Sequence, residues 1–145
     1  FPAVEVRAEI IPELPPLYVH PALIEQALFN VLENAARFSP DGAAVTVTAR
    51  PVDGQVVLDI VDRGPGIPET ERRRIFDMFY SVARGDHGDG GSRGSGLGLT
   101  IVRGMVGAHG GRVEALPGPE GVGTTIRLVL PLREPPAEGV AADDR

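Results

Sequence analysis

The chain has 145 residues, enough for one globular domain with its own core, and 42% of them are hydrophobic. Its net charge of −6, from 20 acidic and 14 basic residues, argues against a broad nucleic-acid-binding surface, because phosphate backbones require a concentrated basic face. Lysine and cysteine are both absent, which excludes a P-loop lysine, Schiff-base chemistry, disulfides and thiolate metal sites.

Short strands are expected at residues 4–10 and 17–19, on either side of a proline-rich turn. An amphipathic helix is expected over residues 22–38, where apolar residues recur every three or four positions, and the SPDG segment ends it. This helix carries a row of polar side chains on the face opposite its apolar stripe, namely Asn30, Asn34 and Arg37.

The polar row has two explanations that the helix alone does not separate. A solvated helix face accounts for it. Uncharged amide oxygens beside a guanidinium would also suit Mg²⁺ held partly by phosphates, with the arginine on the same phosphates.

Residues 44–50 and 55–62 are expected to form a β-hairpin around the turn at residues 53 and 54. Asp62 ends the second strand, and Gly64 and Gly66 follow it. A carboxylate there can accept a hydrogen bond from an exocyclic amine such as that of adenine, while the glycines let the backbone approach a flat ring. An Asx-type turn that ends the strand is the alternative.

The next segments predict a short helix at residues 69–76, with Phe76 and Phe79 as core anchors, and a mobile glycine-rich loop at residues 81–95. Closely spaced glycines then lead into a second helix at residues 98–108. The N-terminus of that helix could bind an anion, although a flexible hinge is the alternative.

Strands are expected at residues 111–116 and 124–132, and a disordered tail at residues 133–145. The count is five or six mostly antiparallel strands with two long helices that must cover one sheet face. The sequence therefore predicts an α+β fold, a two-layer α/β sandwich, in a single domain over residues 1–132.

Four segments, in this order along the chain, closely resemble the sequence boxes of the ATP-binding catalytic domain of sensor histidine kinases, in the superfamily shared with gyrase and MutL. FNVLENAARFSP resembles the N box, DRGPGIP the G1 box, IFDMFY the F box and GSGLGLTIV the G2 box. The resemblance covers roughly residues 4–132 and implies the Bergerat ATP-binding fold. Residues 104–118 further resemble potassium-regulating, Kdp-type sensor kinases.

The resemblance implies that the cofactors are ATP and Mg²⁺. Asn34 would coordinate the Mg²⁺ that bridges the phosphates, with Asn30 nearby and Arg37 on a phosphate. The amino group of adenine would be recognised by Asp62, supported by Gly64, Gly66 and Thr124.

The resemblance also implies that the loop at residues 81–95 closes over the phosphates. The G2-box residues that would meet the nucleotide are Gly94, Gly96, Leu97, Gly98 and Leu99. Where the family often has a basic residue after the F box, this chain has Ser81, and Arg84 could take over that phosphate contact.

Hydrolytic members of the superfamily carry a glutamate where this chain has Asn30, so the resemblance implies phosphate transfer to a histidine rather than to water. None of His20, His87 and His109 lies in the family's phosphoacceptor context. That histidine is expected on a dimerisation domain outside this segment. The alternatives are a serine kinase or an ATPase of the same superfamily, or a non-catalytic nucleotide-binding signalling module.

The expected partners are that dimerisation domain and the receiver domain of a response regulator. Contact with nucleic acid or with a membrane is not expected for this segment. We expect a monomeric cytoplasmic domain here, and a homodimeric, inner-membrane sensor as the full-length protein.

Overall fold

The computed structural model describes residues 5–10, 18–40, 42–77 and 98–132. Within these residues one mixed sheet has the strand order β1-β2-β3-β5-β4. The strands are β1 (Glu5–Ile10), β2 (Ala44–Val52), β3 (Gln55–Asp62), β4 (Arg112–Pro117) and β5 (Thr124–Pro131). Strand β1 runs parallel to β2, and the other neighbours are antiparallel, so the sheet is mostly antiparallel, as predicted.

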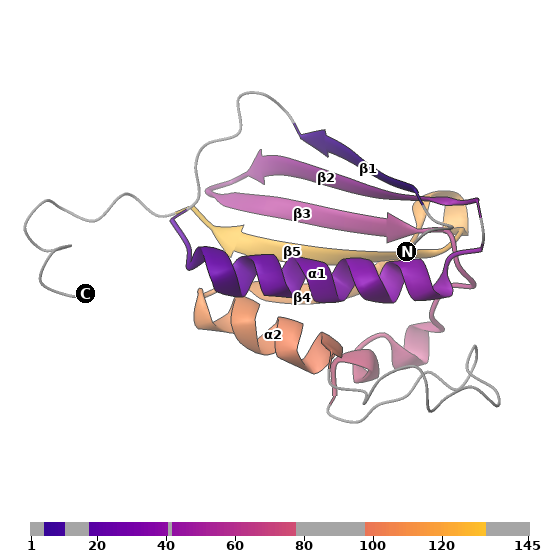
Figure 1. Cartoon of the computed structure of the whole chain (residues 1–145). Coiled ribbons are helices and arrows are strands. Elements are labelled where there is room, and N and C mark those ends of the chain that lie inside the picture. The colour runs from indigo at the N-terminus through magenta and orange to yellow at the C-terminus, as the bar shows by residue number, and fades with distance from the viewer. Residues whose placement is uncertain (1–4, 11–17, 41, 78–97, 133–145) are drawn as a thin grey trace, which may run out of the picture.

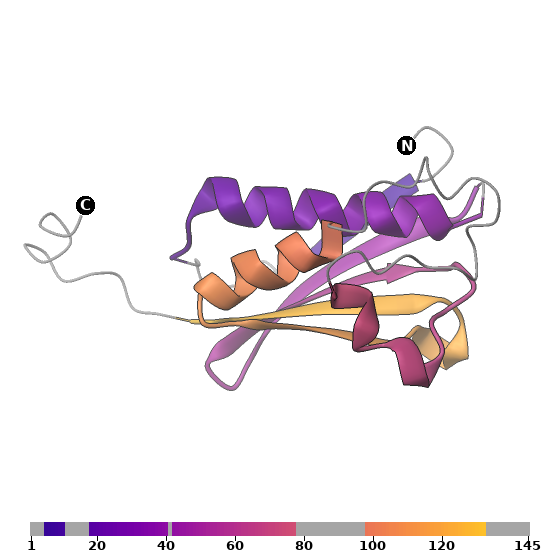
Figure 2. The same ribbon diagram turned by 90° about the horizontal axis from the view of Figure 1, so that it is seen from below.

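The two long helices, α1 (Pro21–Phe38) and α2 (Gly98–Ala108), lie together on one face of the sheet (Figures 1 and 2). Pro21 stands at the first turn of α1, where its missing N–H costs no helix hydrogen bond. The core fills the space between the helices and the sheet, and its most buried side chains include Val31, Val102, Ile60, Ile126 and Leu128. The predicted α+β two-layer sandwich is confirmed.

The β2–β3 hairpin turns at Asp53 and Gly54, whose φ angles of 50° and 79° are both in the left-handed region. Two such residues match the twist of the flanking strands, and the register pairs Val52 directly with Gln55. The predicted hairpin is therefore confirmed at its expected turn.

Two predicted elements differ in the structure. Tyr18 and Val19, the described part of the strand expected at residues 17–19, are not in a strand; Val19 instead packs against the core just before α1 begins. The helix expected at residues 69–76 is two short 3₁₀ turns, Glu69–Glu71 and Arg74–Phe76. Only Ile75 and Phe76 in this segment are apolar and buried, too few to stabilise a continuous helix.

Several other predictions lie outside the described residues: the Phe79 anchor, the loop at residues 81–95 and the tail at residues 133–145. In the described part of the chain, no helix combines the length and the apolar character needed to cross a membrane.

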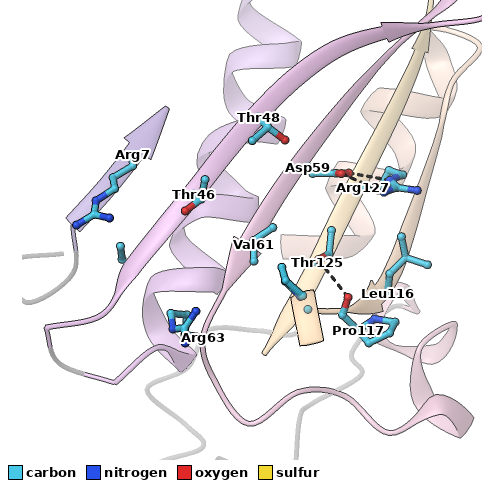
Figure 3. A pocket seen from close by; sticks show the side chains of 13 residues that line it. Arg7, Thr46, Thr48, Asp59, Val61, Arg63, Leu116, Pro117, Thr125 and Arg127 are labelled. Carbon is cyan, nitrogen blue, oxygen red and sulfur yellow. Dashed lines mark hydrogen bonds and ion pairs between the residues drawn. The ribbon is translucent and has the colours of Figure 1, made fainter. Parts of the chain in front are cut away.

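The uncovered face of the sheet carries an ion cluster around the buried Asp59 (Figure 3). Arg127 donates to both carboxylate oxygens of Asp59 at 2.7 and 3.0 Å, and Arg50 donates to Oδ2 at 3.1 Å. Burial by itself raises the pKa of Asp59, but the hydrogen bonds from Arg127 and Arg50 outweigh it, so the pKa lies below its ordinary value. The cluster joins β2, β3 and β5 across the face that the helices leave open.

Asp59→Asn should lower the free energy of unfolding by about 2 kcal/mol at neutral pH, because two arginines lose their carboxylate. Since the pKa of Asp59 is lower in the folded state, this stabilisation is complete above the unfolded-state pKa near pH 4 and is lost as the pH falls through the folded-state pKa. Urea denaturation at a series of pH values should show the difference from wild type shrinking only in acid. A difference of the same size at all pH values would contradict this role, and Asp53→Asn in the exposed hairpin turn is the control.

Candidate functional site

Asp62 ends β3 on the same strand face as the core residue Ile60, and it is only 4% exposed. Its Oδ1 accepts hydrogen bonds from the backbone N–H of Gly64 at 2.9 Å and of Thr124 at 3.2 Å. Thr124 is the register partner of Asp62 in β5 and is also buried. The end of the β3–β5 pairing therefore fixes the orientation of this carboxylate.

Glycine backbone packs tightly around Asp62. A Cβ at Gly64 would lie 2.5 Å from the carbonyl oxygen of Phe38, the last residue of α1. A Cβ at Gly123 would lie 1.9 Å from the carbonyl oxygen of Asp62. Gly66, with φ of 84°, faces the carbonyl oxygen of Gly123. The G1-like segment thus joins the C-terminal end of α1 to the adjoining ends of β3 and β5 by backbone contacts.

The polar row of α1 is only partly exposed to solvent. Asn30, Asn34 and Arg37 are half-buried, whereas Gln26 one turn earlier is exposed. The row is therefore not a fully solvated helix face. Asn34 makes no side-chain hydrogen bond with another described residue, so its amide oxygen is available to a ligand.

Asn30 connects α1 to the start of α2. Its Oδ1 accepts a hydrogen bond from Gln26 Nε2 at 2.9 Å, and its Nδ2 lies 3.5 Å from the carbonyl oxygen of Gly98. The hydroxyl of Thr100 donates to the carbonyl oxygen of Phe76 at 2.9 Å, which ties the first turn of α2 to the F-box-like segment. These contacts hold the positive end of the α2 dipole beside the polar row of α1.

The predicted site residues thus form two groups, one where α1 and β3 end and the other where α2 begins beside the middle of α1 (Figure 1). One group is Asp62 with its glycines and Thr124, and the other is Asn30 with Gly98. Within the described residues no hydrogen bond joins the two groups. Leu99 is 9% exposed and packs in the core, so only its backbone could meet a ligand.

Four predicted site residues lie outside the described residues, namely Arg84, Gly94, Gly96 and Leu97. Three positions contribute to the geometry without having been singled out from the sequence: Phe38, Thr100 and Gly123. Gly123 had one available signal, a glycine two residues after Gly121 and directly before a strand.

A known protein family and several curated relatives match most of this chain. Residues 19–134 match the protein family described as histidine kinase-, DNA gyrase B-, and HSP90-like ATPase. The chain is 43% identical over 129 residues to the signal transduction histidine-protein kinase/phosphatase MprB of Mycolicibacterium paratuberculosis, which covers 85% of this chain and 24% of the relative. It is 41% identical over 95 residues to the sensor protein KdpD of Clostridium acetobutylicum, an alignment that covers 66% of this chain and 10% of the relative. The chain therefore spans a quarter or less of these curated relatives.

Solved structures agree with the sequence relatives. The mycobacterial sensor histidine kinase MprB superposes with a TM-score of 0.76 at 35% identity, covering 92% of this chain and 85% of that one. Full-length ShkA in complex with AMPPNP superposes with a TM-score of 0.74 at 30% identity, covering 92% of this chain and 27% of that one. The resemblance to histidine kinase catalytic domains is confirmed, and a Kdp-type sensor is among the relatives.

Gly123→Ala should lower the free energy of unfolding by about 3 kcal/mol, because its methyl group would collide with the carbonyl oxygen of Asp62. Gly121 is a matched control: its φ of 79° is close to the 75° of Gly123, but no described atom lies within 4 Å of a Cβ placed there. Gly121→Ala should therefore cost only the backbone strain, about 1 kcal/mol. Equal losses for the two variants in urea denaturation would show that crowding at Asp62 is not the cause.

Proposed function

Because the chain belongs to the histidine kinase-, DNA gyrase B- and HSP90-like ATPases, as a histidine kinase catalytic domain of two-component signalling, we propose that it binds Mg-ATP and donates the γ-phosphate to a histidine on a separate dimerisation domain. The observation that carries the proposal is the fixed Asp62 carboxylate. It lies where β3 and α1 end, on the face of the sheet that also carries the polar row of α1 and the start of α2.

Asp62 recognises the adenine base in this proposal. A carboxylate held on Oδ1 by two backbone N–H groups keeps one orientation, so it can accept a hydrogen bond from the amino group of adenine without first being ordered. The backbone beside the carboxylate is also closely packed, because a Cβ at Gly64 would meet the carbonyl of Phe38 and a Cβ at Gly123 would meet the backbone carbonyl of Asp62. The support is therefore rigid, which suits recognition of a planar base.

The polar row of α1 and the start of α2 meet the phosphates. The half-buried amide oxygen of Asn34 is of the kind that Mg²⁺ accepts, and Mg²⁺ commonly takes its remaining ligands from phosphates and water. When bound, Mg²⁺ would neutralise charge on the phosphate oxygens. Arg37, one turn further along α1, would contact a phosphate, and the N-terminal turn of α2 would direct backbone N–H groups toward the same anion.

Asn30 favours transfer to another protein group over hydrolysis. An amide cannot accept a proton at neutral pH, so it cannot activate water as a carboxylate would. Its hydrogen bond from Gln26 and its proximity to Gly98 give it a positioning role between the helices. An ATPase or a serine kinase of the same superfamily remains the competing function, and hydrolysis by the isolated domain would favour the ATPase.

The partners follow from the same proposal. The chain covers 24% of the MprB relative, whose remaining length leaves room for sensing and dimerisation segments. We propose that a dimerisation domain of the same protein supplies the histidine and that a receiver domain of a response regulator takes the phosphate from it. The full-length protein would then be a homodimer, anchored in the inner membrane with this domain in the cytoplasm.

Asp62→Asn should weaken ADP binding about 100-fold. The introduced amide would present an N–H group to the amino group of adenine, so that the two N–H donors face each other and neither has an acceptor. The same amide can donate to O6 of guanine, so the preference for ADP over GDP should fall or reverse. Titration calorimetry with both nucleotides in the presence of Mg²⁺ measures this. Asp59→Asn is the matched control, since Asp59 lies on the same strand but faces the opposite side, and it should keep the adenine preference. An unchanged preference in Asp62→Asn would exclude the proposed role of Asp62.

Mixing the domain with γ-labelled ATP, Mg²⁺ and a purified helical domain that carries a histidine kinase phosphoacceptor should label that domain with acid-labile phosphate. Asn34→Ala should reduce the rate at least about 100-fold, because the Mg²⁺-bound phosphates lose a protein ligand. Glu25→Ala changes an exposed residue of the same helix and should leave the rate unchanged. Release of inorganic phosphate without labelled protein would instead identify an ATPase.

A further inference from the structure

The side chain of His109 joins the end of α2 to the start of α1. Its Nε2 atom lies 3.0 Å from the backbone nitrogen of His20, the residue just before α1. Its Nδ1 atom lies 2.8 Å from the carbonyl oxygen of Met105, one turn back in α2. Both ring nitrogens of this half-buried histidine are therefore used, one within α2 and one between the two helices.

These two contacts determine which ring nitrogen carries the hydrogen. The backbone N–H of His20 can only donate, so Nε2 must accept with its lone pair. The carbonyl oxygen of Met105 can only accept, so Nδ1 must carry the hydrogen and donate it. A neutral ring with its hydrogen on Nδ1 satisfies both partners, whereas neither the other tautomer nor the doubly protonated ring does.

The backbone that follows α2 fixes the point from which the His109 ring projects. Gly110 has φ of 78°, and the N–H of Gly111 donates to the carbonyl oxygen of Val106 at 3.0 Å, which closes the end of the helix. A Cβ at Gly111 would collide with the carbonyl oxygen of Val129 in β5. The end of α2 is therefore closed and packed directly against the sheet.

The His109 bridge is one of two contacts that align α2 with α1. At the other end of α2, Nδ2 of Asn30 lies 3.5 Å from the carbonyl oxygen of Gly98. The two contacts are about 16 Å apart along each helix at the usual helical rise. Equal spacing on both helices fits their side-by-side packing (Figures 1 and 2). A helix held at one point can pivot about it, whereas two points fix its direction.

We propose that His109 is a positioning residue for the nucleotide site, acting from the opposite end of α2. The inference rests on the proposed function, in which the first turn of α2 directs backbone N–H groups toward the phosphates. The hydrogen bond between His109 and His20 sets the direction of that first turn relative to Asn34. Asp62 is held by backbone N–H groups outside α2, so the bridge affects binding of the phosphates and not of the adenine base.

Two substitutions remove the bridge from opposite sides. His109→Asn keeps a side-chain N–H near the position of Nδ1, so it can still donate to Met105, but it is too short to reach His20. His20→Pro removes the N–H donor itself, and the φ of −81° at this position is close to the range of proline.

Each bridge variant has a matched control at the same position. His109→Gln has a longer side chain, which can present an oxygen to the N–H of His20. His20→Ala keeps that N–H, and within the described residues the side chain of His20 makes no capping hydrogen bond that the substitution would remove.

Titration calorimetry with ADP and Mg²⁺ tests the inference. Both bridge variants should bind ADP about fivefold more weakly than wild type, a modest loss because the hydrogen bond that they remove is exposed. Adenosine, which lacks phosphates, should bind to them as it does to wild type. The two controls should bind ADP within about twofold of wild type. Equal losses of ADP and adenosine binding would overturn the inference in favour of a general loss of structure.

The His109 ring gives a second, direct readout. At about pH 8, where an ordinary histidine side chain is neutral, long-range ¹H–¹⁵N correlation spectra should show the ring hydrogen on Nδ1, and a hydrogen on Nε2 would overturn the inference. If wild type bound no ADP, the nucleotide proposal would fail and this inference with it. ADP binding by wild type with no loss in either bridge variant would overturn this inference alone.

Discussion

The pairing of β3 with β5 is the constraint on which the candidate site depends. It brings Asp62 opposite Thr124, although the two residues are 62 positions apart in the sequence. Because the pairing is antiparallel and ends there, the N–H of Thr124 is directed at the Asp62 carboxylate instead of continuing the ladder. The glycines at 64 and 123 then allow the backbone to close around this pair. A carboxylate that would be expensive to bury alone is thereby held by two donors.

The helices add the second half of the site by packing on one face only. Helix α1 carries the half-buried polar row, and the amide of Asn30 reaches the first residue of α2. The end of α1 simultaneously presses its carbonyl at Phe38 against Gly64. One helix thus contacts both the Asp62 group and Gly98 at the start of α2. Relative movement of α1 and the sheet would change the distance between the two groups, so the tight contact at Gly64 matters for both.

Much of this could be predicted from the sequence, for local reasons. The apolar period of α1, the alternation in β2 and β3 and the Asp-Gly turn each depend on neighbouring residues, and all three elements form as expected. The prediction of a helix at residues 69–76 was wrong because this segment has too few apolar residues to pack a continuous helix against the core. The half-burial of Asn34 was missed because the width of the buried stripe depends on how α1 lies against α2 and the sheet. The spacing of apolar residues within α1 does not indicate how the helix lies against its neighbours.

The candidate site residues were predicted from the order of four motifs, whereas no motif marks the open face of the sheet. Asp59, Arg50 and Arg127 come from three strands, and only the register of β2, β3 and β5 brings them together. Side chains along β3 point alternately to the two faces of the sheet, so Ile60 and Asp62 face the helices, while Asp59 and Val61 face the open side. A strand buried on one face and charged on the other is stable here because the Asp59 cluster satisfies its own charges.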